Sequence, residues 1–170
     1  MNQSITVFNR QRARPVNLPL LRQAIGILLR DLLACDSFLF ALHLVAPEEI
    51  TRLNQQFLNH QGSTDVISFD YSEPRPSKNS NITPSLEGEI FVCVEEAVAQ
   101  ARKFRVSWQR ELARYAIHGI LHLCGYDDLR PMPRRQMKRE EDRLLRALAR
   151  KIPLQQFAKR KQRPASRRSL

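Results

Sequence analysis

Residues 107–128, SWQRELARYAIHGILHLCGYDD, form the stretch that decides how this chain folds and what it does. Ser107 is a residue type that caps the first turn of a helix, and Gly125 supplies the left-handed turn that commonly ends one. Between them, His118 and His122 are four residues apart, so on a helix they lie on the same face. The spacing therefore predicts one helix that carries both histidines and is followed by a sharp turn.

Two imidazoles placed in this way are able to share one metal ion at about 2.0–2.1 Å from each ring nitrogen. After the turn at Gly125 the chain doubles back, which brings Asp128 within reach as a third ligand. Asp127 is the alternative third ligand, but its position is better suited to orienting a histidine through a hydrogen bond. Three protein ligands leave one coordination position open, as in catalytic zinc sites, so we interpret the chain as a metal-dependent hydrolase.

The residue after the first histidine opposes a zinc-peptidase function. The HExxH signature of those enzymes places a glutamate, which acts as the general base, directly after the first histidine. Here that position is Gly119, which has no side chain. Catalysis would then depend on metal-bound water, whose pKa a zinc ion lowers toward about 7. The sequence thus favours a hydrolase of another class.

Strand and helix patterns alternate along the chain. Short apolar or β-branched runs predict strands, and apolar residues at helical spacing predict helices. Strands are expected at 5–8, 38–45, 64–71 and 88–94, the last two as an antiparallel pair, and helices at 18–34, 47–58, 95–104, 107–125 and 134–151. The predicted fold class is α/β (α+β layered), a small four-stranded mixed sheet packed with four to six helices. A long surface loop is expected at 72–86.

Length and composition indicate one domain. A chain of 170 residues is large enough for a core of its own, and we expect a single metal-dependent hydrolase domain over residues 1–153. Residues 154–170 are expected to form a basic, disordered tail. No apolar run approaches the roughly 18 residues of a membrane span, so no membrane partner is expected. Three scattered cysteines without a CxxC pair indicate a reducing, cytoplasmic environment.

The formal net charge is +11, from 28 basic and 17 acidic residues. Six of the basic residues lie in 158–170 without any acidic residue, so the rest of the chain keeps about +5. A second basic cluster follows the histidine motif and consists of Arg130, Arg134, Arg135, Lys138 and Arg139. So basic a protein indicates a polyanionic partner, of which nucleic acid is the commonest.

The complete motif resembles the signature of the YbeY-type endoribonucleases, H-G-x-L-H-L-x-G-Y-D-H, a bacterial rRNA-maturation family. The chain matches it from His118 to Asp127, and Asp128 stands where the family usually has a third histidine. Other segments that look like parts of this family are LNQQF at 53–57, TDVISF at 64–69, GEI at 88–90, and Met137 with Glu141 in the last helix. The resemblance covers roughly residues 38–145.

The resemblance implies a zinc-dependent endoribonuclease that cleaves single-stranded RNA. It implies a role in 3′-end maturation of small-subunit (16S) rRNA and in ribosome quality control, with rRNA and ribosomal subunits as partners. By position, His118, His122 and Asp128 would be the catalytic residues and the ligands of one Zn²⁺ ion. The oxygen ligand also suits other divalent ions, such as Mn²⁺.

Leu58 departs from the family, which has an arginine at that position. An arginine suits phosphate binding, and we expect His60 or Arg52 to compensate for its loss. Arg114 is a further candidate for a phosphate contact, and Ser68 is expected to line the cleft from its strand. Leu58 also leaves an alternative open: an rRNA- or ribosome-binding assembly factor with a structural metal and weak or no nuclease activity.

Overall fold

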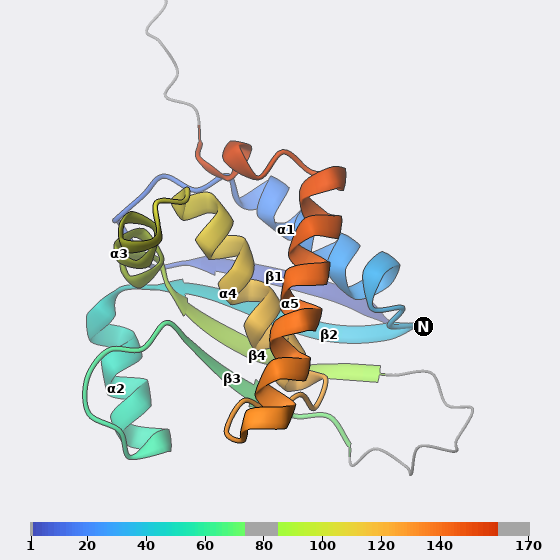
Figure 1. The fold of residues 1–170 in the computed structure, drawn as a ribbon, viewed down its shortest axis with the longest axis horizontal. Helices are drawn as coiled ribbons and strands as arrows, with labels where there is room; N and C mark the ends of the chain where they lie inside the picture. Colours follow the sequence, from blue (N-terminus) through green and yellow to red (C-terminus); the bar gives the residue numbers. More distant parts are fainter. Residues whose placement is uncertain (1, 74–84, 160–170) are drawn as a thin grey trace, which may run out of the picture.

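The computed structural model of this protein describes residues 2–73 and 85–159. Its elements in chain order are β1 (Gln3–Asn9), α1 (Leu18–Gly26), the π-helical segment η1 (Ile27–Leu32), β2 (Ser37–Val45), α2 (Pro47–Leu58), β3 (Val66–Asp70), β4 (Ser85–Cys93), α3 (Val94–Phe104), α4 (Trp108–Leu123), α5 (Pro131–Lys151) and the 3₁₀ turn η2 (Leu154–Phe157). The strands form one sheet in the order β1-β2-β4-β3, in which only β3 runs antiparallel to its neighbour. The predicted layered α/β fold with a four-stranded mixed sheet is therefore confirmed (Figure 1).

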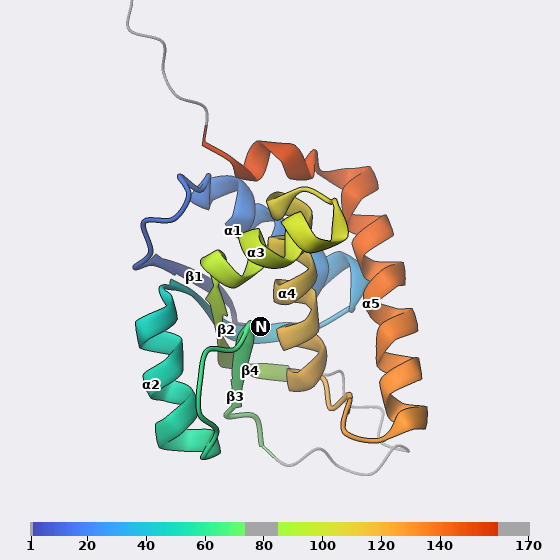
Figure 2. The same ribbon diagram turned by 60° about the vertical axis from the view of Figure 1, so that its left-hand side comes forward.

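The helices cover the two faces of this sheet unequally (Figure 2). Successive side chains of a strand point to opposite faces. Phe40 of β2 and Ile90 of β4 point into the main core, which α1, α3, α4 and α5 complete. On the opposite face, Ile50 of α2 packs with Phe91 and Cys93 in a smaller cluster. The histidine-bearing helix α4 therefore lies on the main-core side, and α2 lies across the sheet from it.

Two helices differ from the prediction. The helix expected at 18–34 is α-helical only to Gly26, and the π-helical segment η1 continues it to Leu32. The last helix begins at Pro131, three residues before the predicted start. A proline suits the first helical position, because the N–H that it lacks would have no partner within the helix. The prolines at 131 and 133 therefore belong to the first turn of α5.

The ordered chain also extends beyond the domain boundary predicted at 153. Leu154 and Phe157 of η2 are buried, and Val16 and Ala158 form an isolated β-bridge. The prediction stopped at Pro153 because that residue ends α5, but the apolar side chains after it pack onto the core. Residues 160–170 of the predicted tail, and 74–84 of the predicted loop, lie outside the described residues. No helix in the described ranges is long and apolar enough to cross a membrane.

Candidate metal centre

Helix α4 holds its two histidines at the edge of the core. Its N-terminus is capped by Ser107, whose Oγ accepts a hydrogen bond from the backbone N–H of Arg110 at 3.2 Å. Gly119 faces the sheet, where a Cβ would lie 3.0 Å from Ile90 Cγ2 and 3.1 Å from its Cδ1. Because this side of α4 packs so closely, His118 and His122 occupy the side that remains partly exposed.

The turn after α4 brings the chain back toward the histidines. Gly125 has a φ of 88°, a left-handed conformation that glycine adopts without strain. Its N–H donates to the carbonyl of His122 at 2.9 Å, and the N–H of Tyr126 donates to the carbonyl of Leu121 at 3.0 Å. These bonds satisfy carbonyls at the helix end. The predicted left-handed turn at Gly125 is confirmed, and it leads directly to Asp128.

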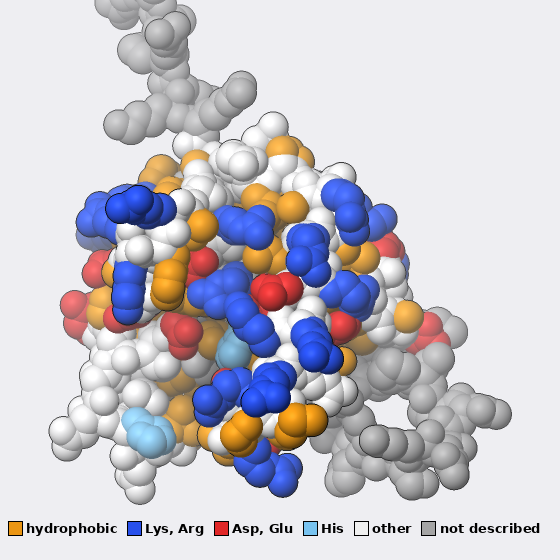
Figure 3. All heavy atoms as spheres, in the orientation of Figure 1, with side chains coloured by type: hydrophobic (Ala, Val, Ile, Leu, Met, Phe, Trp, Pro, Cys, Tyr) orange, Lys and Arg blue, Asp and Glu red, His pale blue; other side chains and the backbone are white. Residues whose placement is uncertain are grey.

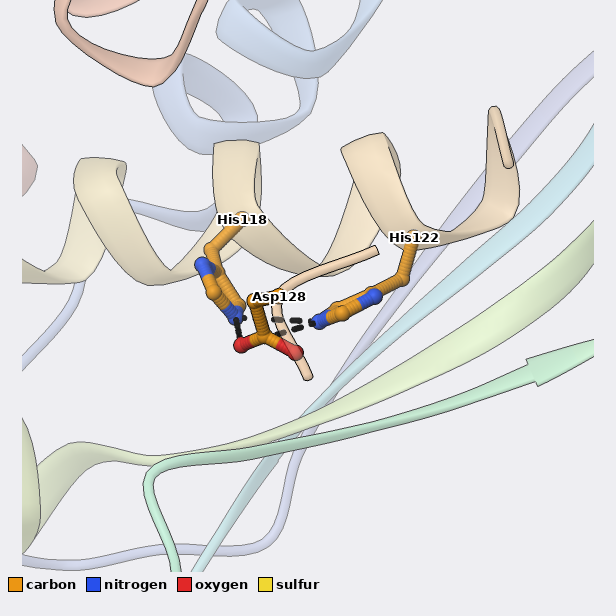
Figure 4. Close-up of side chains that lie close together, drawn as sticks. All are labelled: His118, His122 and Asp128. Carbon is orange, nitrogen blue, oxygen red and sulfur yellow. Dashed lines mark hydrogen bonds and ion pairs between the residues drawn. The ribbon is translucent and has the colours of Figure 1, made fainter. Parts of the chain in front are cut away.

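Three donor atoms meet at this turn, as Figure 4 shows. The Nε2 atoms of His118 and His122 lie 3.1 Å apart, and Asp128 Oδ2 lies 3.5 Å from the first and 3.7 Å from the second. The side chains are 24%, 30% and 37% exposed, so the group is accessible to solvent. The structure therefore brings the three predicted ligands together, with Asp128 pointing toward both rings.

The second nitrogen of each ring is held by a hydrogen-bond acceptor. His118 Nδ1 lies 3.0 Å from Glu141 Oε2, and His122 Nδ1 lies 3.1 Å from the carbonyl oxygen of Tyr126. These acceptors assign the ring protons to Nδ1 and leave a lone pair on each Nε2. Two lone pairs and a carboxylate that face one another repel, unless a cation lies among them. The donor set therefore fits an ion such as Zn²⁺, which takes imidazole nitrogen and carboxylate oxygen.

Glu141 connects this group to helix α5. Its side chain is 3% exposed, and it accepts hydrogen bonds from His118, from Arg114 at 3.2 Å and from Lys138 at 3.4 Å. Burial acts to raise the pKa of this carboxyl, but the hydrogen bond from His118 and the charge of Lys138 outweigh it and hold the pKa below its usual range. Glu141 is therefore an ionised acceptor that fixes the His118 ring.

Glu141 is not among the predicted site residues, although its position in the sequence carries a signal for a role there. Met137, Leu144, Leu145 and Leu148 mark the buried stripe of α5, and Glu141 lies within it. A carboxylate on an otherwise apolar helix face has to be paired when that face is buried, because an unpaired buried charge is very costly. The position of Glu141 within the buried stripe therefore indicates that its carboxylate pairs with a residue on the neighbouring helix.

Replacing Glu141 by alanine should weaken zinc binding by about 10–100-fold, the usual effect of removing a group that orients a metal-binding histidine. Glu141→Gln should lose less, because its amide oxygen still accepts the Nδ1 proton of His118. Glu140→Ala is the matched control, since Glu140 is the preceding residue and pairs with Arg143. Competition with a chromophoric chelator measures the affinity of the folded variants. Equal zinc affinities for Glu141→Ala and Glu140→Ala would contradict the orienting role.

Asp127 shapes the turn and does not orient a histidine. Its Oδ1 accepts a hydrogen bond from the N–H of Leu129 at 2.8 Å, and its Oδ2 lies 3.8 Å from Arg130 Nε. An aspartate side chain bonded to the backbone two residues ahead is typical of an Asx turn. The contact that we expected from Asp127 is made by Glu141 and Tyr126 instead.

Arg114 lies one turn before His118, but its charge is already paired. Its Nη2 lies 2.5 Å from Glu111 Oε2, and its Nη1 lies 3.2 Å from Glu141 Oε1. Burial acts to lower the pKa of this guanidinium, but the two carboxylates outweigh that effect and raise it above its ordinary value. Arg114 therefore holds Glu141 in position and has little charge left to offer a phosphate.

The remaining predicted residues do not reach the three donors. Ser68 lies behind α4, where its Oγ donates to the backbone carbonyl of Gly119 at 3.2 Å and so ties β3 to the helix. Arg52 and His60 are exposed on and just after α2, across the sheet from α4 (Figure 2). In the described residues, no hydrogen bond or ion pair joins either of them to His118, His122 and Asp128, which together form the donor group.

Comparisons with known proteins find a family profile and relatives that carry the same description. The family profile described as Endoribonuclease YbeY matches residues 7–149. Endoribonuclease YbeY of Salinibacter ruber is 39% identical over 109 residues, which are 64% of this chain and 69% of the relative. Endoribonuclease YbeY of Chlorobium phaeovibrioides is 40% identical over 97 residues, which are 57% of this chain and 60% of the relative.

A solved structure shares the fold as well. The solution structure of TM1509 from Thermotoga maritima superposes with a TM-score of 0.60 at 25% sequence identity and covers 96% of this chain and 100% of that one. The family profile spans most of the sequence, including every residue of the donor group. The chain therefore belongs to the YbeY endoribonuclease family.

Proposed function

We propose that this protein is a zinc-dependent endoribonuclease that cleaves single-stranded RNA. The observation that carries the proposal is the approach of His118 Nε2, His122 Nε2 and an Asp128 carboxylate oxygen to within 4.8 Å of one another. Both rings are oriented through Nδ1, so their lone pairs are available at one place. Zn²⁺ suits this set of donors, and Mn²⁺ is the alternative because of the oxygen ligand.

The chain contributes geometry to the reaction. When bound, the ion would polarise a phosphoryl oxygen and lower the pKa of a water molecule. Hydrolysis adds water to phosphorus, breaks one P–O ester bond and places a proton on the departing ribose oxygen. Helix α4 fixes the spacing of His118 and His122, the turn at Gly125 presents Asp128, and Glu141 holds the first ring in place.

Positive charge surrounds the donor group. Figure 3 shows lysine and arginine side chains gathered over α3, α4 and α5, around a histidine in the hollow between them. The basic cluster of the sequence occupies the start of α5, where Arg130, Arg134, Arg135, Lys138 and Arg139 are all exposed. Such charges bind the phosphate backbone of nucleic acids. The preference for single strands rests on the family to which the chain belongs.

The proposed setting is 3′-end maturation of small-subunit (16S) rRNA and ribosome quality control in the cytoplasm. The partners would be rRNA and ribosomal subunits. The likeness of the histidine motif to the family signature supports this setting, as does the net charge of +11. Three scattered cysteines fit a reducing compartment.

A second candidate is an assembly factor that binds rRNA or ribosomes and uses its metal to stabilise the fold. Leu58 favours this candidate, because it is 47% exposed at the end of α2, at a position where the family has an arginine. Leucine neither binds a phosphate nor neutralises charge that develops on one. The two candidates differ in whether RNA is cut.

The deciding experiment incubates zinc-loaded protein with an unstructured RNA and with the same sequence as a duplex. We expect cleavage of the single strand, little cleavage of the duplex, and loss of activity on chelation that added zinc restores. Leu58→Arg is assayed in parallel, and co-sedimentation with small ribosomal subunits at low salt tests the second candidate. If the zinc-loaded wild type leaves RNA intact while Leu58→Arg cuts it, the nuclease proposal fails for the natural chain.

A further inference from the structure

A small pocket adjoins the donor group on the side of α5. Its volume is about 160 Å³, and its walls include His118, Asp128 and the buried Glu141. Two cationic side chains of α5, Arg134 and Lys138, also line it, together with Asp65, Arg114, Tyr115 and Met137. Two of the proposed metal ligands therefore share a pocket with basic side chains from a different helix.

Arg134 is fixed beside the donor group by one edge of its guanidinium. Its Nε donates to the backbone carbonyl of Asp128 at 2.7 Å. No other hydrogen bond or ion pair of this side chain occurs in the described ranges. A guanidinium carries five N–H groups, so the four on its terminal nitrogens remain available. Arg134 is therefore anchored and still able to bind an anion.

The other cations of the pocket are less suited to this task. Arg114 is paired with two carboxylates, as described above. Lys138 Nζ lies 3.4 Å from Glu141 and 3.6 Å from Asp142, and its side chain is 57% exposed. Only the pair with Asp142, whose side chain is 46% exposed, is an exposed ion pair of the kind that contributes little to stability, so Lys138 can exchange that carboxylate for a phosphate. It would act as a second point charge next to Arg134.

The N-terminal end of α5 carries positive side chains, where acidic side chains would stabilise the helix. The N-terminal end of a helix bears partial positive charge and favours acidic side chains. The first turn of α5 has no acidic residue, the N-cap is Arg130 without a side-chain cap, and Arg134 and Arg135 follow. The charges at this end of α5 are therefore compatible with an anion bound next to Arg134.

From this geometry we infer that Arg134, assisted by Lys138, binds a phosphate of the RNA backbone next to the metal centre and positions the scissile bond. A guanidinium fork matches a phosphate with two parallel hydrogen bonds, which a lysine cannot do. The inference rests on the proposed function and deepens it. It also assigns phosphate binding to α5 instead of to α2, where Leu58 stands.

The test compares Arg134→Gln with Arg135→Gln. Both remove one positive charge from the same turn of α5, but Arg135 lines a different hollow, with Met132 and Arg139. In zinc-loaded protein, Arg134→Gln should weaken binding of inorganic phosphate by about 10-fold and lower kcat/KM for single-stranded RNA by about 10–100-fold. Arg135 belongs to the basic cluster but lines a different hollow, so Arg135→Gln should weaken phosphate binding and lower kcat/KM by only about 2–3-fold, the latter mainly through KM. Arg134→Lys should restore only part of the loss.

The zinc affinity of Arg134→Gln shows whether Arg134 binds phosphate or only holds Asp128 in place. The glutamine amide can still donate to the Asp128 carbonyl, so Arg134→Gln should keep its zinc affinity within about 3-fold, less than the loss from removing a ligand-orienting group. If zinc affinity falls in step with cleavage, Arg134 serves only to hold Asp128 and the inference is overturned. Equal losses for Arg135→Gln would overturn it too, because diffuse charge would then explain the effect.

Failure of the inference and failure of the proposed function give different results. If the wild type cuts RNA and Arg134→Gln cuts it equally well, the nuclease stands and the inference is wrong. If the wild type cuts no RNA but phosphate binding still depends on Arg134 and not on Arg135, the anion site stands and the proposed function fails.

Discussion

The His122→Ala variant should lose zinc affinity by at least about 100-fold, because even groups that only orient a ligand contribute 10–100-fold. His118→Ala should do the same, and both should lose RNA cleavage with the metal. Asp128→Asn tests the third donor, since it keeps the size of the side chain and removes its charge. Zinc content after dialysis and a chelator competition titration give the affinities, and cleavage of unstructured RNA is measured on the same samples.

His60→Ala is the control for these variants. It removes an imidazole that is exposed near the end of α2, across the sheet from the donor group, so zinc affinity should stay unchanged. If Asp128→Asn binds zinc as tightly as the wild type, the three-ligand centre is wrong and the ion, if any, is held by the histidines alone. RNA cleavage that persists in metal-free His122→Ala would contradict the metal-dependent mechanism.

Gly119→Glu should destabilise the fold by about 3 kcal/mol or more, although it recreates the HExxH pattern of zinc peptidases. A Cβ at this position already lies 3.0 Å from Ile90 Cγ2 and 3.1 Å from Val66 Cγ2, so the carboxylate would enter the interface between α4 and the sheet. It would be buried there without a partner and could not reach the donor group on the other side of the helix. Urea unfolding followed by circular dichroism measures the loss.

Gly119→Ala adds only a Cβ at this position and serves as the milder variant for comparison. Alanine gains about 1 kcal/mol of helix propensity over glycine, which offsets part of the cost of the close contacts. We therefore expect a smaller change than for glutamate, below about 2 kcal/mol. A stable Gly119→Glu protein that hydrolyses casein and is stopped by a chelator would mean that the side chain reaches the metal and that the packing described here is wrong.

The parts of the structure that the sequence predicts well are those set by neighbouring residues. Helix α2 has the predicted bounds, Pro47–Leu58, because proline and two glutamates mark its first turn and Asn59 takes a left-handed φ of 55° after it. The turn at Gly125 follows from the same kind of local signal. The three donors lie within a short run of chain, so helical spacing and one turn were enough to predict that they meet.

The parts that it predicts poorly depend on packing between distant segments. Glu141 lies 23 residues after His118, and only the approach of α5 to α4 brings the two together. Arg114 was a candidate for a phosphate because the sequence does not show that Glu111 and Glu141 already neutralise it. Phe157 is buried although it follows a helix-ending proline. Its place in the core is created by segments that are distant in the sequence, so the local pattern could not predict it.

The short turn between α4 and α5 has a consequence for how the site opens. Donors at His118, His122 and Asp128 lie on both sides of Gly125, so an ion bound to all three would close the chain into a small ring, as a cross-link does. Glu141 extends that ring to the next helix through its bond to His118. Peeling the turn away from α4 would then release the ion, so the turn and a bound ion would each hold the other in place.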